Sequence, residues 1–376
     1  MMNAPAGQAR RMAVQLLNEI LGEGRLMAEL TTGGMMDRLD PADRARAQRL
    51  TGDVLRGLER ADKILKRHLR KPPPLHVMNA LRLGVVELCQ GEASHGVVNE
   101  TVEIVARNKR TAPMKGLVNA ILRKVANEGP TEWVKLRVPR LPKWLRVPLV
   151  EAYSSEAVMA MEAAHFAGAP LDLTAKGDAV ELAKLVEGVL TPTGSVRLQN
   201  AGQVSALAGF AEGAWWVQDT AAALPAKILT AQKGEKVLDL CAAPGGKTMQ
   251  LAATGADVTA LDISEGRMAR VRSNLERTGL AAEIVVGDAL THAGGPYDAI
   301  LLDAPCSATG TIRRHPDLPH AKDGSEFGAL IGMQGDLIDH AWSLLKSGGR
   351  LVFCTCSLLP DEGECQIEEA LEIFPD

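Results

Sequence analysis

The 376-residue chain is poor in aromatic residues, which make up 3% of its sequence. A recognition surface built from stacked Phe and Tyr rings is therefore not expected. The chain also lacks an apolar run long enough to span a membrane, and Gln8, Arg10 and Arg11 interrupt the segment where a signal peptide would have its apolar core. Its six cysteines are irregularly spaced, which favours reduced thiols over a disulfide framework. We expect a cytoplasmic protein without membrane contact.

The formal net charge of −4 conceals an asymmetry along the chain. Residues 1–130 carry 21 basic and 14 acidic side chains, a balance of +7, whereas residues 131–215 stand at −1 and residues 216–376 at −10. A basic front indicates contact with a polyanion such as nucleic acid. The alternative is a solvated surface without a partner, because an excess of this size is only moderate.

The front of the chain has a helical pattern. Asp40 and Pro41 suit the N-cap and first position of a helix, and strand-like alternation is absent. We expect an all-α domain over residues 1–130. Its predicted helices include residues 76–89, 97–107 and 114–126.

Prolines punctuate the next segment, which we interpret as a linker over residues 131–149, docked by Trp133 and Trp144. Residues 150–215 then mix helical and strand-like patterns, which predicts a small α+β module. From residue 216 onward strands and helices alternate regularly. This alternation requires a parallel, doubly wound sheet, so we expect an α/β Rossmann-like domain over residues 216–376. The predicted strands are 236–240, 257–262, 283–288, 299–303 and 350–354, with helices at 264–278 and 328–346 among the connections.

A glycine-containing loop follows the first of these strands and leads into a helix. Glycines let a ligand approach the backbone closely, and the helix N-terminus offers free N–H groups. The loop is neither the dinucleotide-binding nor the phosphate-binding glycine motif, since the latter requires a glycine at residue 241. We expect Cys241 to shape the loop rather than react. The predicted cofactor loop consists of Cys241, Ala242, Ala243, Pro244, Gly245, Gly246 and Lys247.

Carboxylates end the next two strands. Asp262, 15 residues after Lys247, can accept hydrogen bonds from both ribose hydroxyls of an adenosine, and Asp288 can accept from an adenine amino group. Each aspartate alone is as well explained as a helix cap or turn residue. Together with the glycine loop they favour a nucleoside cofactor without a pyrophosphate, and S-adenosylmethionine is such a molecule.

Two further strands run into cysteine, with Cys306 after one and Cys356 after the other. Reactive groups of α/β sheets lie just beyond the carboxyl ends of strands. A thiolate that adds to C6 of cytosine makes C5 nucleophilic enough to take a methyl group from a sulfonium, and a base must then remove the C5 proton. Asp303 is placed to bind N3 and assist the addition. The spacing does not say which thiol attacks and which assists release.

Other interpretations remain open for these residues. A zinc site built from cysteines is disfavoured because no Cys-x-x-Cys or paired histidine is present, so we expect no metal. We interpret Cys89, Cys354 and Cys365 as plain core residues. A basic cluster after the Cys306 loop can clamp RNA phosphates, although a solvated loop explains it nearly as well. This predicted RNA-binding cluster consists of Arg313, Arg314 and His315.

Several segments together resemble a known family, the RNA 5-methylcytosine methyltransferases of the RsmB (Sun/Fmu) type, which act on small-subunit (16S) ribosomal RNA. In the back half the segments are residues 239–248, 303–317 and 355–360. In the front half, residues 98–103 and 116–123 resemble the NusB-like RNA-binding domain that these enzymes carry. The resemblance implies that Cys356 is the nucleophile and that Cys306 assists product release. It also implies that the predicted cofactor loop, Asp262, Asp288 and Asp303 line the S-adenosylmethionine site.

The chain departs from the family pattern at two places. Where the family has an Arg-x-Asn pair in the first strand of the middle module, residues 171–175 read Leu-Asp-Leu-Thr-Ala, which puts an RNA contact in doubt. The family also continues beyond the helix at 364–374 with two more strands, whereas this chain stops at Asp376. We therefore expect the methyltransferase domain to lack its last strands, which would leave the strand before Cys356 exposed along its edge.

The function expected from these observations is S-adenosylmethionine-dependent transfer of a methyl group to C5 of a cytosine in 16S ribosomal RNA, through a covalent cysteine–C6 adduct. We expect a monomer acting on naked or early-assembly RNA, with the target base out of its stack. One alternative is a non-catalytic RNA-binding or ribosome-assembly factor with a truncated methyltransferase domain. Another is methylation of a protein or small molecule, which the basic front disfavours.

Overall fold

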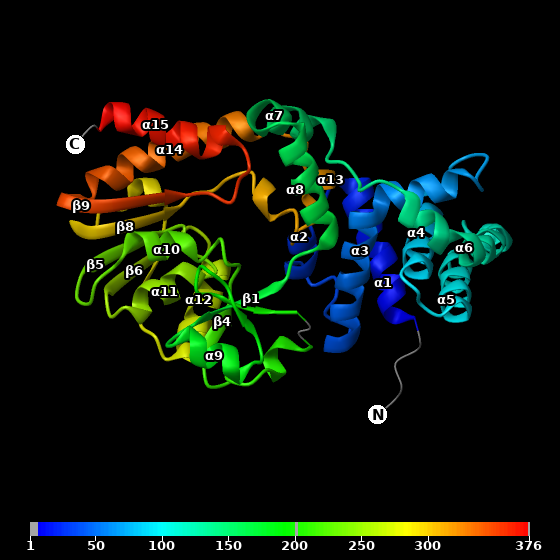
Figure 1. Cartoon of the computed structure of the whole chain (residues 1–376), viewed down its shortest axis with the longest axis horizontal. Helices are drawn as coiled ribbons and strands as arrows, with labels where there is room; N and C mark the ends of the chain where they lie inside the picture. Colours follow the sequence, from blue (N-terminus) through cyan, green and yellow to red (C-terminus); the bar gives the residue numbers. More distant parts are fainter. Residues whose placement is uncertain (1–6, 200–201, 375–376) are drawn as a thin grey trace. The chain divides into compact units, whose positions relative to one another are not determined.

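The computed structural model describes residues 7–199 and 202–374, which form two compact units (Figure 1). The first unit contains residues up to Ala169 together with Thr309–Ser325, and the second contains Pro170–Ala308 and the chain from Glu326 onward. This division does not follow the expected domain limits at residues 130, 149 and 215. Those limits stay predictions, because one compact unit can hold more than one domain.

The first unit is helical, as predicted. Helices α1, α3, α4, α5 and α6 pack around one aliphatic core in which Leu17, Leu81 and Leu122 are fully buried. Asp40 caps α3 as expected, and its carboxylate accepts a hydrogen bond from the Asp43 amide at 2.8 Å. The helices of this unit are α1 (Gln8–Glu23), α2 (Met27–Thr32), α3 (Pro41–Lys66), α4 (Leu75–Cys89), α5 (Ser94–Arg107), α6 (Lys115–Lys135), α7 (Lys143–Tyr153), α8 (Ser155–Ala167) and α13 (Leu318–Ala321).

Helix α6 is longer than predicted. The expected helix ended at residue 126, but α6 runs through Pro130 to Lys135. A proline inside a helix removes one backbone hydrogen bond. The extra turns bury Trp133, which packs directly over Gly57 of α3 and lies 5.5 Å from the Arg60 guanidinium. Burial of a tryptophan offsets the lost hydrogen bond, so tertiary packing overrides the local signal.

The second unit begins with a small sheet of order β2-β3-β1-β4, in which all pairs are antiparallel. Asp172 lies on β1, the strand whose sequence departs from the family's Arg-x-Asn pattern. Its carboxylate is fully buried and accepts two hydrogen bonds from Arg197, at 2.7 and 2.8 Å, and one from the Thr220 amide. The Asp172 side chain therefore links β1 to β3 and to the segment that follows β4. The elements are β1 (Leu171–Ala175), α9 (Ala179–Leu185), β2 (Val189–Leu190), β3 (Val196–Leu198) and β4 (Trp215–Val217).

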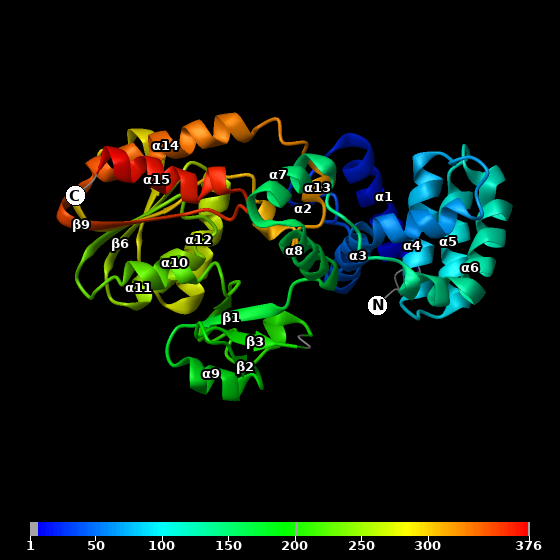
Figure 2. The same cartoon turned by 45° about the horizontal axis from the view of Figure 1, so that its top comes forward.

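The predicted parallel sheet follows, with strand order β7-β6-β5-β8-β9. Leu238 and Leu240 of β5 pack with residues of α14, whereas Val237 packs with α10 and α11. Helices thus cover both faces of the sheet, as Figure 2 shows. The elements are α10 (Leu224–Leu229), β5 (Lys236–Leu240), α11 (Gly246–Ala253), β6 (Asp257–Asp262), α12 (Glu265–Thr278), β7 (Glu283–Val286), β8 (Tyr297–Asp303), α14 (Phe327–Ser343), β9 (Leu345–Cys354) and α15 (Glu364–Ile373).

Three details of this unit differ from expectation. Strand β9 begins at Leu345, five residues early, and so shortens the predicted helix 328–346. Strand β7 ends at Val286, where its pairing with β6 stops. Cys365, expected in the core, is exposed on α15.

Strand β9 forms one edge of the sheet that the structure describes, and the final residues 375 and 376 lie outside the described part. Within residues 7–199 and 202–374, no helix combines the length and the apolar character needed to cross a membrane.

Candidate active site

The predicted cofactor loop links β5 to α11, and carboxylates on two neighbouring strands form hydrogen bonds with it and with the start of α11. Asp239 on β5 accepts a hydrogen bond from the Thr248 hydroxyl at 2.6 Å, and Asp262 at the end of β6 accepts one from the Ala243 amide at 3.2 Å. Gly245 has a φ of +99°, and a Cβ there would lie 3.1 Å from the Val271 side chain. Glycine is required at this turn because a side chain is disfavoured both by the backbone conformation and by the available space.

The ends of β6 and β7 offer a surface suited to a nucleoside. Asp262 is buried, and the next residue, Ile263, is an apolar side chain that is 70% exposed. Asp288 follows β7, is exposed, and accepts a hydrogen bond from the amide of Leu290, which is 37% exposed. Exposed apolar side chains beside carboxylates match an adenine ring and a ribose. These residues therefore fit S-adenosylmethionine. Ile263 was not among the site residues expected from the sequence.

Asp303 at the end of β8 faces the cofactor loop. Its carboxylate accepts a hydrogen bond from Lys247 Nζ at 2.7 Å, and the Cys354 sulfur lies 3.5 Å from its other oxygen. Burial is the largest influence on the pKa of Lys247 and lowers it. The charge and hydrogen bond of Asp303, together with Cys354 and Asp239, outweigh burial, so the pKa ends above its ordinary value. Cys354, expected to be a plain core residue, thus contacts a predicted site residue.

A cavity of about 390 Å³ lies beside this ion pair. Part of the predicted cofactor loop forms one wall of the cavity, and the segment that follows β4 forms another. Its lining includes Trp216, Gln218, Pro244, Lys247 and Asp303. The cavity places a carboxylate, an ammonium group and an aromatic ring around one space, which suits a polar planar ligand.

The structure brings the two predicted thiols together. Strands β8 and β9 are adjacent and parallel, with Asp303 opposite Cys354. Because the register is set there, Cys306 and Cys356 emerge from the same edge of the sheet, and their sulfurs lie 3.4 Å apart. Cys306 is half-buried and Cys356 is exposed.

The contact between the sulfurs changes how they ionise. The hydrogen bond between the sulfurs lowers the pKa of the Cys306 thiol, and the same contact raises the pKa of the Cys356 thiol. The pair therefore loses its first proton more readily than an isolated thiol and holds the second more tightly. In this arrangement Cys306 is the sulfur that ionises first, and Cys356 keeps its proton and donates to it.

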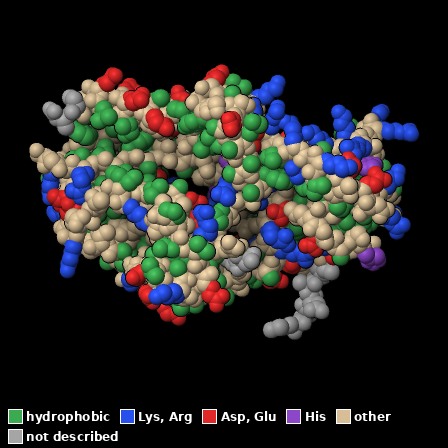
Figure 3. All heavy atoms as spheres, in the orientation of Figure 1, with side chains coloured by type: hydrophobic (Ala, Val, Ile, Leu, Met, Phe, Trp, Pro, Cys, Tyr) green, Lys and Arg blue, Asp and Glu red, His purple; other side chains and the backbone are tan. Residues whose placement is uncertain are grey.

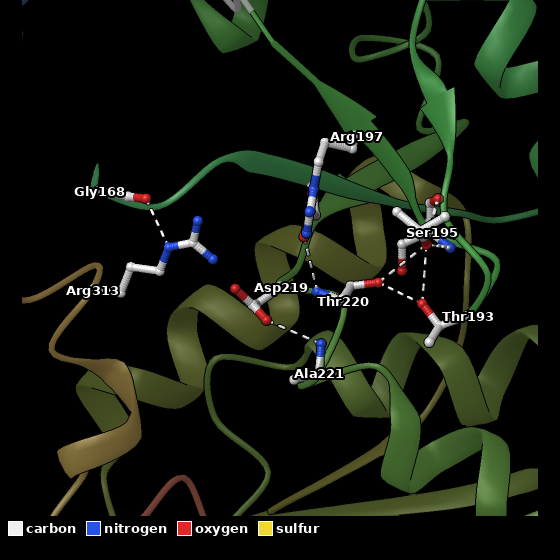
Figure 4. Close-up of polar contacts among 10 residues, drawn as sticks. Gly168, Thr193, Ser195, Arg197, Asp219, Thr220, Ala221 and Arg313 are labelled. Carbon is white, nitrogen blue, oxygen red and sulfur yellow. Dashed lines mark hydrogen bonds and ion pairs between the residues drawn. The ribbon is translucent and has the colours of Figure 1, made fainter. Parts of the chain in front are cut away.

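The predicted RNA-binding cluster belongs to the first unit. Arg313 Nε donates to the Gly168 carbonyl at 2.7 Å (Figure 4), and Arg56 donates to the Arg313 carbonyl at 3.2 Å. The backbone amides of Arg314 and His315 both donate to the Thr311 carbonyl at 2.8 Å. These bonds order the segment, and its RNA contact stays a prediction. Within residues 7–199 and 202–374, no group of three or more His, Cys, Asp or Glu is arranged to hold a metal.

The doubly wound parallel sheet is the fold of the Rossmann-like S-adenosylmethionine-dependent methyltransferases, and the family match places the chain in that class. Residues 226–376 match the family described as 16S rRNA methyltransferase RsmB/F, and residues 7–127 match the NusB family. The chain belongs to the RsmB/F family of small-subunit ribosomal RNA methyltransferases.

Relatives of this family match nearly the whole chain. Ribosomal RNA small subunit methyltransferase B of Salmonella arizonae is 32% identical over 98% of this chain and 90% of its own length. The protein of the same name from Sodalis glossinidius is 33% identical over the same shares.

Two solved structures share the fold. The structure of PH0851 has a TM-score of 0.74 at 22% identity and covers 98% of this chain and 90% of its own. A methyltransferase homolog protein from Pyrococcus horikoshii has a TM-score of 0.54 at 28% identity, over 61% of this chain and 78% of its own.

Proposed function

We propose that this protein transfers a methyl group from S-adenosylmethionine to C5 of a cytosine in 16S ribosomal RNA, through a covalent bond between Cys356 and C6 of the base. The observation that carries the proposal is the 3.4 Å separation of the Cys306 and Cys356 sulfurs at the carboxyl ends of β8 and β9. Two thiols this close supply both a nucleophile and a second group to complete the reaction on one pyrimidine ring.

Each thiol has a distinct task in this proposal. The Cys356 thiolate forms a C–S bond at C6, and the electron pair of the C5–C6 double bond becomes available at C5. The bound cofactor supplies an electrophilic methyl group that C5 takes up. Once Cys356 is bonded to C6, its negative charge no longer opposes ionisation of Cys306, which gives up its own proton to solvent and is then placed to accept the C5 proton. The C–S bond breaks as this proton leaves, and Cys356 departs as a thiolate. Because N3 of cytosine accepts hydrogen bonds, Asp303 would have to bind it as a protonated carboxyl group, after exchanging one of its present partners, Lys247 or Cys354.

Ribosomal RNA as the substrate is supported by the family and by charge. The helical front carries an excess of basic side chains, and Figure 3 shows Lys and Arg over helices of the first unit, with side chains of both signs on each unit. Neutralised phosphates make RNA binding strongly salt-dependent. The target cytosine must leave its stack to reach a thiol and a methyl donor together, which favours an unpaired segment.

The test is methyl transfer from radiolabelled S-adenosylmethionine to protein-free 16S RNA, followed by nucleoside analysis. The intact chain should produce 5-methylcytidine, and Cys356→Ala should lower the rate by at least about a thousandfold because the covalent route is lost. Cys365→Ala, which alters an exposed cysteine on α15, is the matched control and should retain the wild-type rate. Label recovered in another nucleoside would contradict the proposal.

A non-catalytic assembly factor would bind the RNA without transferring a methyl group, so the same experiment separates the two functions. Comparing naked RNA with partly assembled subunits as substrate tests the expected preference for naked or early-assembly RNA. A monomeric state and a cytoplasmic location stay predictions of the sequence.

A further inference from the structure

A fully buried carboxylate lies between the two cysteine loops. Glu362 ends the short 3-10 helix Pro360–Glu362 and has no exposed surface. Its carboxylate accepts hydrogen bonds from the Ser307 amide at 2.8 Å, from the Ser307 hydroxyl, and from Gln334 Nε2 at 3.2 Å. Ser307 directly follows Cys306, so this side chain holds the first cysteine loop at two atoms.

Glu362 also holds the second loop. Its backbone carbonyl accepts a hydrogen bond from the Thr355 hydroxyl at 3.0 Å, immediately before Cys356. The hydroxyls of Ser307 and Ser357 lie 3.2 Å apart, which joins the residues that follow the two cysteines. Gln334 of α14 extends the network by donating to the Pro305 carbonyl at 2.8 Å. Ser307, next to Cys306, and Thr355, next to Cys356, therefore both form hydrogen bonds with Glu362.

Burying this carboxylate is costly unless the group has a specific role. Among the residues that the structure describes, its partners are hydrogen-bond donors and no cation forms an ion pair with it. Burial of a charged group without a counter-ion is unfavourable, and an apolar side chain of similar volume would fill the space without that cost. Past Asp303 and Cys354 the loops leave the sheet pairing, so strand register alone does not fix the sulfur positions.

We infer that Glu362 is a positioning residue that holds the Cys306 and Cys356 loops so that both sulfurs reach one pyrimidine ring. The consequence for catalysis rests on the proposed function, whereas the effect on the thiol pair does not. Glu362 touches neither sulfur in its hydrogen-bond network and acts through Ser307, Thr355 and Ser357. Its removal should leave each cysteine present but relax their mutual geometry.

Phenylarsine oxide is a direct probe of that geometry, because its arsenic binds two sulfurs that lie close together and releases one water. The intact chain should bind it tightly, and Cys306→Ser should bind it far more weakly. Glu362→Ala should bind at least about tenfold more weakly than the intact chain, since small displacements of preorganised groups are costly. Glu362→Gln should lose less, because its amide oxygen still accepts from the Ser307 amide. Glu364→Gln, an exposed neighbour, is the matched control and should behave as wild type.

Ser307→Ala tests the same network with a milder change, in case Glu362→Ala does not fold. Ser307→Ala removes the hydroxyl that donates to Glu362 but leaves the backbone amide bond, and it should weaken binding about threefold. If Glu362→Ala does not fold, Ser307→Ala and Glu362→Gln decide the outcome. Wild-type arsenical affinity in every folded variant would overturn the inference.

Methyl transfer supplies the catalytic readout. In Glu362→Ala, kcat should fall by about tenfold to a hundredfold, while KM for the RNA stays within about twofold, because no RNA contact is assigned to this residue. A change confined to KM would contradict a positioning role. If the intact chain transfers no methyl group but the arsenical results hold, the proposed function fails and the role of Glu362 in holding the thiols stands.

Discussion

Asp239, a buried carboxyl group beside the predicted cofactor loop, makes the stability of the fold depend on pH. Its side chain is fully buried, one oxygen accepts from the Thr248 hydroxyl, and the other oxygen has no hydrogen-bond partner in the described structure. Burial raises the pKa of Asp239 to about 7, and the nearby charges of Asp303 and Asp262 act in the same direction, while Thr248 and Lys247 oppose them.

The raised pKa of Asp239 predicts that stability falls as the pH rises. In the unfolded chain this carboxyl ionises near pH 4, so its contribution is fully present below about pH 4 and is lost as the pH rises through about 7. The loss amounts to at most about 4 kcal/mol. Asp239→Asn keeps an oxygen that accepts from Thr248 and should reduce the decrease in Tm between pH 5 and pH 8. Thermal unfolding measured at both values is the check, and an unchanged decrease would contradict the assignment.

At the scale of single residues, the sequence was most informative where a motif is long. The sequence predicted a glycine-containing loop between a strand and a helix and two cysteines at strand ends, and the structure has both. The roles of these residues stay predictions. Ile263 was missed, although an apolar residue directly after a strand-ending aspartate is a usable signal. Glu362 carried no signal, because its partners are on loops and a helix that are 28 and 55 residues away in the chain.

The junction between α12 and the small sheet depends on close backbone contact. Arg277 of α12 donates to the carbonyls of Phe210 and Trp215 and stacks over the Phe210 ring at 4.4 Å. Gly213 has a φ of +65°, and a Cβ there would lie only 2.1 Å from the Arg277 carbonyl oxygen. A backbone atom is unable to move aside as a flexible side chain does, so this contact requires glycine.

Gly213→Ala should therefore destabilise the second unit by about 2–4 kcal/mol, from the strained backbone conformation and the clash together. Urea unfolding followed by tryptophan fluorescence measures the change, because Trp215 and Trp216 are buried in this unit. Gly177→Ala is the matched control, since nothing lies within 4 Å of a Cβ at that position. Equal unfolding midpoints for the two variants would refute this account of the junction.

At the scale of elements, regular patterns predicted the helical front and the parallel sheet, while local exceptions were missed. The alternation of strands and helices after residue 216 was sufficient because each strand is a short apolar run. The continuation of α6 through Pro130 was not predictable locally, since it depends on Trp133 packing against Gly57, which is 76 residues earlier in the chain. Long-range packing of this kind leaves no periodic pattern.

At the scale of the whole molecule, the chain passes between the two units more than once. Thr309–Ser325 belongs to the first unit, although the second unit contains both Cys306 before it and α14 after it. Within the first unit, the Asp317 carboxylate accepts from the Met27 amide at 2.8 Å. The residues following Cys306 are therefore anchored to the helical front through a pairing of positions 290 apart, which no local pattern predicts.

The central claim is that Cys356 forms the covalent bond and Cys306 releases it. The most direct measurement uses Cys306→Ala with S-adenosylmethionine and unpaired 16S RNA, followed by denaturing electrophoresis and mass spectrometry of the nuclease- and protease-treated complex. The account predicts a denaturation-resistant RNA–protein adduct whose modified residue is Cys356, and no adduct in the variant that also carries Cys356→Ala. Undiminished methyl transfer by Cys306→Ala without any adduct, or an adduct at another residue, would contradict it.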